Sequence, residues 1–242
     1  MEKHSYKIID LFNTGITLNV ASAITTILTA ILTFIVVVFL TRKLTLRPST
    51  KKQNAAELLA IFVKDNAIKS NVSWTKYGKS LWAAGLTLIS LLLVANTMGV
   101  LLEVSYDHVI YVNSVTADPT FTFALAGMFI LYTHYFGIKE KGTMHYLKTY
   151  TSSGAGLTPF KILEEFTNLL TLSLRLYGNI YAGEVIIGLL GTLALSGVFG
   201  MIIGLPSLVI WKGFSLFIGC IQAYIFTILV FLYLSHKVND EH

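Results

Sequence analysis

The sequence predicts an all-α membrane protein with about five membrane helices and one amphipathic surface helix. Of the 242 residues, 54% are hydrophobic, and the mean hydropathy of +0.68 is too apolar for a soluble domain. Apolar residues form continuous runs, such as 20–40 and 218–234, whereas a membrane β-barrel has short alternating segments. We therefore expect a single integral membrane domain over residues 1–242, built from helices.

The membrane spans follow from windows of about 20 apolar residues, the length that crosses the hydrocarbon. The spans are predicted at residues 20–41, 81–102, 120–138, 160–193 and 206–235. The last two are longer than an upright helix needs, so we expect them to tilt strongly or to run partly along the membrane. Prolines mark helix starts or breaks near three boundaries, and one of them begins the last span. They are Pro48, Pro159 and Pro206.

The loop between the first two spans predicts a surface helix. Within residues 42–79, apolar side chains recur at helical spacing between charged ones. These apolar residues are Ala55, Ala56, Leu58, Leu59, Phe62 and Val63. The pattern is typical of an amphipathic helix that lies on a membrane surface, where its plain role is anchoring.

The charges of the loops predict the orientation of the chain. Residues 42–79 carry nine Lys or Arg against only Glu57 and Asp65, and the positive-inside rule places such a loop in the cytoplasm. The next loop, 103–119, has acidic residues and no Lys or Arg, and the loop at 139–148 is basic again. We therefore expect the N-terminus outside and the C-terminus in the cytoplasm.

Several classes of function find no support in the sequence. The net charge of +5 gathers beside the spans, which indicates a membrane surface rather than nucleic acid. Residues 77–80 imitate the end of a phosphate-binding loop, but Ser73 stands where a glycine is required, and no hydrolase or metalloprotease motif occurs. His134 is interpreted as a packed, hydrogen-bonded residue in preference to a proton carrier. We expect no catalytic residue, cofactor or metal.

Arg175 lies inside a long apolar stretch and is the first candidate for function. An arginine deep in a bilayer costs about 2.5 to 3.5 kcal/mol on insertion scales. The flanks, 169–174 and 185–195, are almost wholly apolar, so the side chain cannot easily reach water. One interpretation is a structural ion pair with Glu184 or another carboxylate. Because Asn179 and Glu184 share the segment, an ion pathway is favoured.

The positions along this helix favour two separate half-channels. At 100° per residue, Asn179 lies about 40° from Arg175 and Glu164 about 20° from it, while Glu184 lies about 180° away. Glu164 is roughly 16 Å to the cytoplasmic side of Arg175, and Glu184 roughly 13 Å to the outer side. Two carboxylates at different depths thus flank a fixed cation, which raises the energy of a passing proton or cation.

The last span carries polar residues on one face, because Ser215, Gln222 and Tyr233 are separated by seven and eleven residues. If this span packs antiparallel to the previous one, Gln222 reaches the level of Arg175. The depths of Ser215 and Glu184 then differ by about 3 Å, so the two should be neighbours. The alternative is that Gln222 and Ser215 only hold helices together by hydrogen bonds.

Two runs of residues carry a resemblance to a known family. They are Leu172-Ser-Leu-Arg-Leu-Tyr-Gly-Asn-Ile-Tyr-Ala-Gly-Glu184 and Ile221-Gln-Ala-Tyr-Ile-Phe-Thr-Ile-Leu-Val-Phe-Leu-Tyr-Leu-Ser235. Both resemble subunit a of the bacterial F-type ATP synthase, the membrane stator that faces the rotating c-ring. The specific similarity covers about 158–237, and the basic loop around Arg47-Pro48 and Asn96 extends it more weakly.

The resemblance implies roles for the polar residues. Arg175 is implied as the stator arginine, and Asn179, Glu184 and Gln222 as neighbouring positions of the proton path. Ser215 stands where some members of the family carry a histidine, and Lys212 adds a cation near the outer end of the last span.

Under the same resemblance, protons enter near Glu184 and reach a c-ring carboxylate, and an inner half-channel lined by Glu164 or Glu165 releases them. Arg175 favours the ionised ring carboxylate, because an opposite charge nearby lowers the pKa of an acid.

The resemblance also implies partners and a location. The partners are the c-ring, subunit b of the peripheral stalk, protons and membrane lipid, and the location is the bacterial cell membrane. ATP chemistry is expected in other subunits, so this chain itself is not expected to be an enzyme. The alternative is a stand-alone secondary transporter coupled to protons or sodium, but such transporters usually have an internal repeat with broken helices. None is evident in the sequence.

Overall fold

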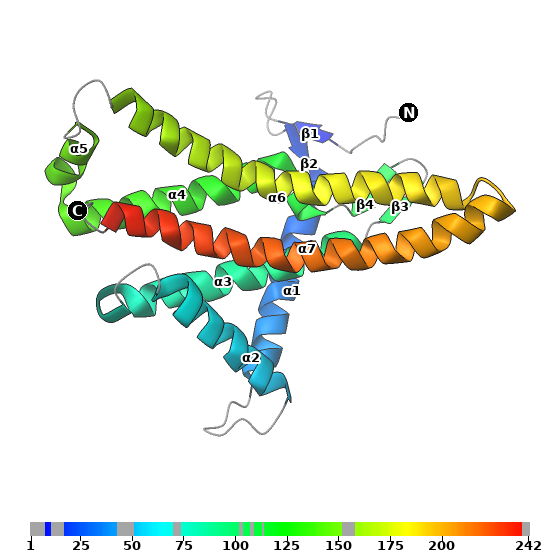
Figure 1. The fold of residues 1–242 in the computed structure, drawn as a ribbon, viewed down its shortest axis with the longest axis horizontal. Helices are drawn as coiled ribbons and strands as arrows, with labels where there is room; N and C mark the ends of the chain where they lie inside the picture. The colour runs from blue at the N-terminus through cyan, green and yellow to red at the C-terminus, as the bar shows by residue number, and fades with distance from the viewer. Residues whose placement is uncertain are drawn as a thin grey trace. The chain divides into compact units, whose positions relative to one another are not determined.

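The computed structural model describes residues 8–10, 17–42, 51–69, 74–101, 104–106, 109–112, 114–151 and 158–238. Helices dominate these residues (Figure 1), as the sequence predicts. The α-helices are α1 Val20–Thr41, α2 Lys51–Phe62, α3 Trp74–Leu101, α4 Pro119–Lys141, α5 Thr143–Thr151, α6 Thr158–Ala194 and α7 Val198–Val238. A π-helix, Val63–Ile68, follows α2, and a 3-10 turn, Val115–Ala117, precedes α4.

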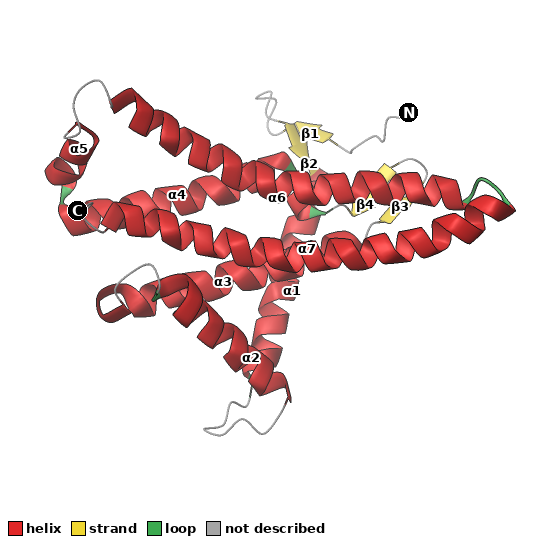
Figure 2. Cartoon of the chain, in the orientation of Figure 1, coloured by secondary structure: helices red, strands yellow, loops and turns green. Residues whose placement is uncertain are grey.

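Two short β-hairpins accompany the helices and were not predicted (Figure 2). Strand β1, Ile8–Asp10, pairs antiparallel with β2, Thr17–Asn19. Strand β3, Val104–Tyr106, pairs antiparallel with β4, Val109–Val112, with an irregularity in register after Val104. Strands of three or four residues leave no hydrophobic alternation long enough to recognise in a sequence. The all-α class is confirmed, with these hairpins as small additions.

Five of the described helices are long and apolar enough to cross a membrane, which confirms the predicted number of spans. They are α1, α3, α4, α6 and α7. Helix α6 has 37 residues and α7 has 41. At about 1.5 Å per residue both are longer than the roughly 30 Å of hydrocarbon, so an upright helix would extend beyond it. The expectation that they tilt or run partly along the membrane stays a prediction.

Proline 206 does not begin the last span, and this prediction was wrong. Helix α7 begins at Val198 and continues through Pro206. A proline removes one backbone hydrogen bond, but membrane helices tolerate this loss where nearby groups adjust to it. Pro159, by contrast, is the second residue of α6, as predicted for a helix start. Pro48 and Arg47 lie outside the described residues.

A tight turn at residues 195–197 connects α6 to α7. Gly197 has a φ of 126°, a conformation that side chains other than glycine rarely adopt. The Ser196 hydroxyl donates to the carbonyl of Leu193 at 2.7 Å, and its backbone N–H bonds the same carbonyl at 3.1 Å. The turn therefore satisfies much of its own hydrogen bonding.

A helix, α2, is present where the sequence predicts a surface helix, and a π-turn follows it. Val63, Ala67 and Ile68 of this π-turn are fully buried. The wider π-turn brings these three residues to one side, an arrangement that an α-helical reading of the sequence does not reveal. Trp82 of α3 donates its indole N–H to the carbonyl of Ala60 at 3.1 Å, which ties α2 to α3.

The chain divides into two compact units. The first comprises residues 1–39, 90–119 and 176–223, and the second comprises 40–89, 120–175 and 224–242. Helices α3, α6 and α7 each contribute to both units. The prediction of one membrane domain over residues 1–242 stays a prediction.

The core of the second unit depends on a close approach at Gly85. A Cβ atom at this position would lie 2.8 Å from Cγ1 of Val63 and 2.9 Å from the ring of Phe231. Both neighbours are almost fully buried, Phe231 with 1% exposure. Helix α3 can therefore approach the π-turn and α7 only because residue 85 has no side chain.

We expect Gly85→Val to destabilise the protein by about 1 to 3 kcal/mol, because the added atoms overpack the contact with Val63 and Phe231. The measurement is the unfolding midpoint of the purified chain in detergent. Gly188→Val is the matched control, since a Cβ at Gly188 meets nothing within 4 Å. Equal midpoints for the two variants would contradict this account of the packing.

Candidate functional site

Two cavities collect most of the residues that the sequence singled out, one in each compact unit. The first unit contains a cavity of about 140 Å³ between α3, α6 and α7. Its lining is mainly apolar, with a small set of polar side chains on the two long helices. These polar side chains are Asn179 and Glu184 of α6 and Ser215 and Trp211 of α7.

Close contact between α6 and α7 shapes this first cavity. Trp211 donates its indole N–H to the carbonyl of Gly183 at 3.3 Å. A Cβ at Gly183 would lie 3.4 Å from Oγ of Ser215, within ordinary van der Waals contact, so the serine lies directly beside this part of α6. Glu184 is the next residue along α6 and is half-buried. The structure thus brings Glu184 and Ser215 to the same cavity.

Two buried amide side chains lie in the same unit. Gln222 is 5% exposed, and its Nε2 atom has no hydrogen-bond partner among the described residues. Asn96 is 2% exposed and donates its Nδ2 hydrogen to the carbonyl of Gly219 at 2.8 Å. Its Oδ1 atom also lacks a partner within the part of the chain that the structure describes. A buried polar atom without a hydrogen bond lowers stability by about 1 to 3 kcal/mol. A group that could hydrogen-bond to either atom would therefore be bound favourably.

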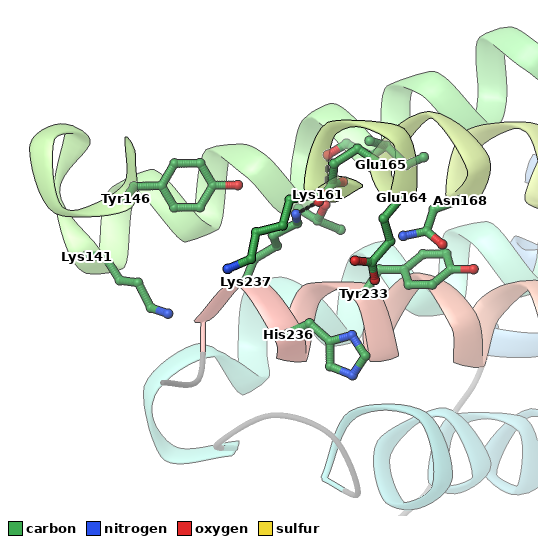
Figure 3. A pocket seen from close by; sticks show the side chains of 11 residues that line it. Lys141, Tyr146, Lys161, Glu164, Glu165, Asn168, Tyr233, His236 and Lys237 are labelled. Atoms are coloured by element: carbon green, nitrogen blue, oxygen red, sulfur yellow. Dashed lines mark hydrogen bonds and ion pairs between the residues drawn. The ribbon is translucent and has the colours of Figure 1, made fainter. Parts of the chain in front are cut away.

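The second unit contains a more polar cavity of about 80 Å³ (Figure 3). Side chains from α4, α5, α6 and α7 line it. The lining residues are Ile130, Thr133, Lys141, Tyr146, Lys161, Glu164, Glu165, Asn168, Tyr233, His236 and Lys237. Both carboxylates that the sequence assigned to an inner half-channel therefore lie at this cavity.

Glu165 belongs to a chain of polar contacts. It forms an ion pair with Lys237 of α7, and its other oxygen lies 3.5 Å from Nε2 of His134. The Nδ1 atom of His134 lies 2.6 Å from the hydroxyl of Tyr146, a side chain of α5 that is 6% exposed. His134 is thus a packed, hydrogen-bonded histidine, as the sequence indicated. The contacts join α4, α5, α6 and α7 at one point.

Gly137 allows α5 to approach closely enough for this contact. A Cβ at Gly137 would lie 2.7 Å from the ring of Tyr146 and 3.2 Å from Cβ of Lys237. A larger residue would separate α4 from both neighbours. The polar contacts of Glu165 therefore depend on close packing at Gly137, about one helical turn after His134 on α4.

Arg175 and Glu164 have a different environment from Glu165. Arg175 is exposed and forms no hydrogen bond or ion pair with any residue that the structure describes. The interpretation of Arg175 as a member of a structural ion pair therefore gains no support from the described chain. Glu164 is also exposed and is without a polar partner in the same described ranges. Glu184 does make a polar or electrostatic interaction.

Sequence reasoning missed several residues that the second cavity contains. Lys161 and Asn168 were not singled out, although they lie three and four residues from Glu164 and so share its helix face. Lys237 reaches Glu165, and Tyr146 reaches its neighbour His134, only through tertiary packing, which the sequence does not display. Within the described residues, no group of three or more His, Cys, Asp or Glu could hold a metal ion.

Comparison with known proteins identifies the family. The family profile of the ATP synthase A chain matches residues 23–235. The ATP synthase subunit a of Staphylococcus carnosus is 47% identical over 234 residues, which cover 96% of each chain. That of Lysinibacillus sphaericus is 45% identical over 227 residues, 94% of this chain and 95% of the relative. That of Bacillus pumilus is 42% identical and covers 94% and 96%. The chain therefore belongs to the ATP synthase subunit a family, whose members are multi-pass membrane subunits.

Proposed function

We propose that this chain is the proton-translocating stator subunit of a bacterial F-type ATP synthase. It provides two half-channels that lead protons to and from the carboxylates of a c-ring, and so couples proton flow to rotation and ATP synthesis. The observation that carries the proposal is the arrangement of charge. Arg175 is exposed and has no polar partner among the described residues, while carboxylates occupy two separate cavities.

The outer half-channel contains Glu184, Asn179 and Ser215 in the first cavity, with Gln222 in the same unit. A proton entering from outside passes Glu184, with the Ser215 hydroxyl or an ordered water as a relay, and reaches an ionised ring carboxylate. Once neutral, this carboxylate can turn into lipid without the cost of burying a charge. The unpartnered amide of Gln222 can bond to a group that passes the end of this route.

The inner half-channel contains Glu164 and Glu165 in the second cavity. After nearly a full rotation the ring carboxylate meets this cavity and releases its proton towards the cytoplasm. Arg175 favours the ionised carboxylate, because an opposite charge within about 4 to 6 Å lowers the pKa of an acid. Its fixed charge also blocks direct leakage between the half-channels. Each charge that crosses delivers about 2.3 kcal/mol per 100 mV.

The face of α6 that carries Arg175 suits the close approach of a ring helix. Thr171, Gly178 and Ala182 lie on this face, four residues before and three and seven residues after Arg175. Thr171 and Ala182 are exposed, and a Cβ at Gly178 would meet nothing within 4 Å. Small residues let helix backbones approach in a membrane. The proposed partners are the c-ring on this face and subunit b of the peripheral stalk, with ATP chemistry in other subunits.

We expect the N-terminus outside the bacterial cell membrane and the C-terminus in the cytoplasm, because the basic loops at 42–79 and 139–148 belong inside. Single cysteines replacing Ser5 or Asp240, in a Cys220→Ser background, should react with an impermeant maleimide from opposite sides. The Cys220→Ser chain without a new cysteine is the control. Labelling of both positions from one side would refute the five-span orientation.

We expect Arg175→Ala to abolish ATP-driven proton pumping in vesicles, while the chain still inserts and assembles. Pumping is lost because the substitution removes the charge that pairs with the ring carboxylate and separates the two half-channels. Arg175→Lys should also fail substantially, since an ammonium does not reproduce a planar guanidinium. Arg42→Ala, at the exposed end of α1, is the matched control and should pump normally. Near-normal pumping by Arg175→Ala would rule out the proposed function.

We expect Glu184→Gln to slow passive proton flux in vesicles stripped of the soluble ATPase sector, because the amide cannot carry the proton. Since Ser215 shares the cavity, Ser215→Glu should restore part of the flux in the double variant. Flux is compared at matched protein levels, with Ser215→Glu alone as control. Unchanged flux in Glu184→Gln would remove this residue from the path, and loss without rescue would argue against its pairing with Ser215.

A further inference from the structure

Two adjacent carboxylates line the second cavity, and their surroundings differ. Successive residues of a helix point about 100° apart, so Glu164 and Glu165 face different neighbours. In Figure 3 Glu164 points towards Tyr233 and Asn168, whereas Glu165 lies on the side of Lys237. The sequence leaves open which of the two carboxylates lines the inner half-channel.

Glu165 is held in place by its partners. Lys237 is 14% exposed and Glu165 is 23% exposed, so their ion pair is largely removed from solvent. His134 reaches the second carboxylate oxygen and is itself bonded to Tyr146. If Glu165 took up a proton, this ion pair would be lost, and Lys237 would remain a mostly buried cation without the carboxylate that it pairs with. Glu165 is therefore poorly suited to repeated protonation.

Glu164 is not held by polar partners in this way. It is exposed at the cavity and has no hydrogen bond or ion pair with the described residues. Lys161 and Asn168 lie one helical turn to either side of it on α6, and Tyr233 lies across the cavity on α7. Protonation and deprotonation of Glu164 would break no existing contact.

The charges that surround Glu164 come from each packed helix. Helix α4 contributes Lys141, α6 contributes Lys161 and Glu165, and α7 contributes His236 and Lys237. Tyr146 of α5 and Tyr233 of α7 are the phenols at the cavity. Because Lys237 is paired with Glu165, the cavity leaves Glu164 as the carboxylate that can exchange a proton.

We propose that Glu164 accepts the proton that the ring releases, and that Glu165 is a positioning residue, fixed by Lys237 and His134, that holds α6 against α4, α5 and α7. The O–H bond of the ring carboxylic acid breaks, an O–H bond forms on Glu164, and Glu164 then gives the proton to cytoplasmic water. This assignment rests on the proposed function, because it presupposes an inner half-channel.

The test compares variants of the two residues in the assembled synthase. Passive proton flux is measured in vesicles stripped of the soluble sector, at matched protein levels and over a range of pH on the cytoplasmic side. Glu164→Gln should reduce flux roughly tenfold or more, as expected when a proton-transfer group is lost, and Glu164→Asp should recover much of it. Glu164→His should move the pH profile, since the exchanging group has changed.

Variants of the ion pair should behave differently. Glu165→Gln should lower the amount of assembled subunit, because Lys237 loses its partner. Glu165→Gln combined with Lys237→Gln should recover assembly in part, since the charges are removed together. Whatever flux this double variant retains should keep the wild-type pH profile.

The assignment is overturned if Glu164→Gln retains normal flux, or if the double variant shifts the pH profile while the Glu164 variants do not. Those outcomes leave the proposed function intact provided that Arg175→Ala still abolishes pumping. Normal pumping by Arg175→Ala would instead reject the proposed function itself. The two failures are therefore distinguishable, because pumping is measured before the soluble sector is stripped from the vesicles and passive flux is measured afterwards.

Discussion

The fold is constrained above all by the cost of charge inside an apolar layer. Arg175 lies in a span where an arginine costs a few kcal/mol, and it has no polar partner among the described residues. Under the proposed function, a carboxylate of the ring compensates this charge, and the two cavities bring protons to and from that carboxylate. The proposal thereby accounts for the small residues around Arg175 and for the carboxylates at a distance from it.

Glycine and buried polar side chains position these parts. Gly85 lets α3 approach α7 and the π-turn in the second unit, and Asn96 fixes α3 to the carbonyl of Gly219 in the first. In the second unit Lys237 and His134 converge on Glu165. A polar group in a membrane interior costs free energy unless it is hydrogen-bonded or paired with an opposite charge. These few interactions therefore fix how the helices pack, which apolar contacts alone would not specify.

The sequence predicted the five spans and the surface helix, because hydropathy over about 20 residues is a strong signal. It also brought attention to Arg175, Glu184 and Ser215, since helical spacing can be counted. It did not reveal the short hairpins, helix α5 or the π-turn, which are too short for periodicity. Nor did it separate Glu164 from Glu165, since the partners of Glu165 come from other helices. The prediction that the last span begins at Pro206 was wrong, because a membrane helix can continue through a proline.

The turn between α6 and α7 has a consequence for biogenesis. Residues 185–211 contain no Asp, Glu, Lys or Arg, and the hydroxyls of Thr192, Ser196 and Ser207 each donate to a carbonyl of their own helix segment. Residues 185–211 can therefore enter hydrocarbon without carrying a charged side chain or an unbonded hydroxyl into it. With the C-terminus in the cytoplasm, as the basic loops predict, α6 and α7 would enter the bilayer together as a hairpin, and Arg175 would not have to cross the membrane to reach its depth.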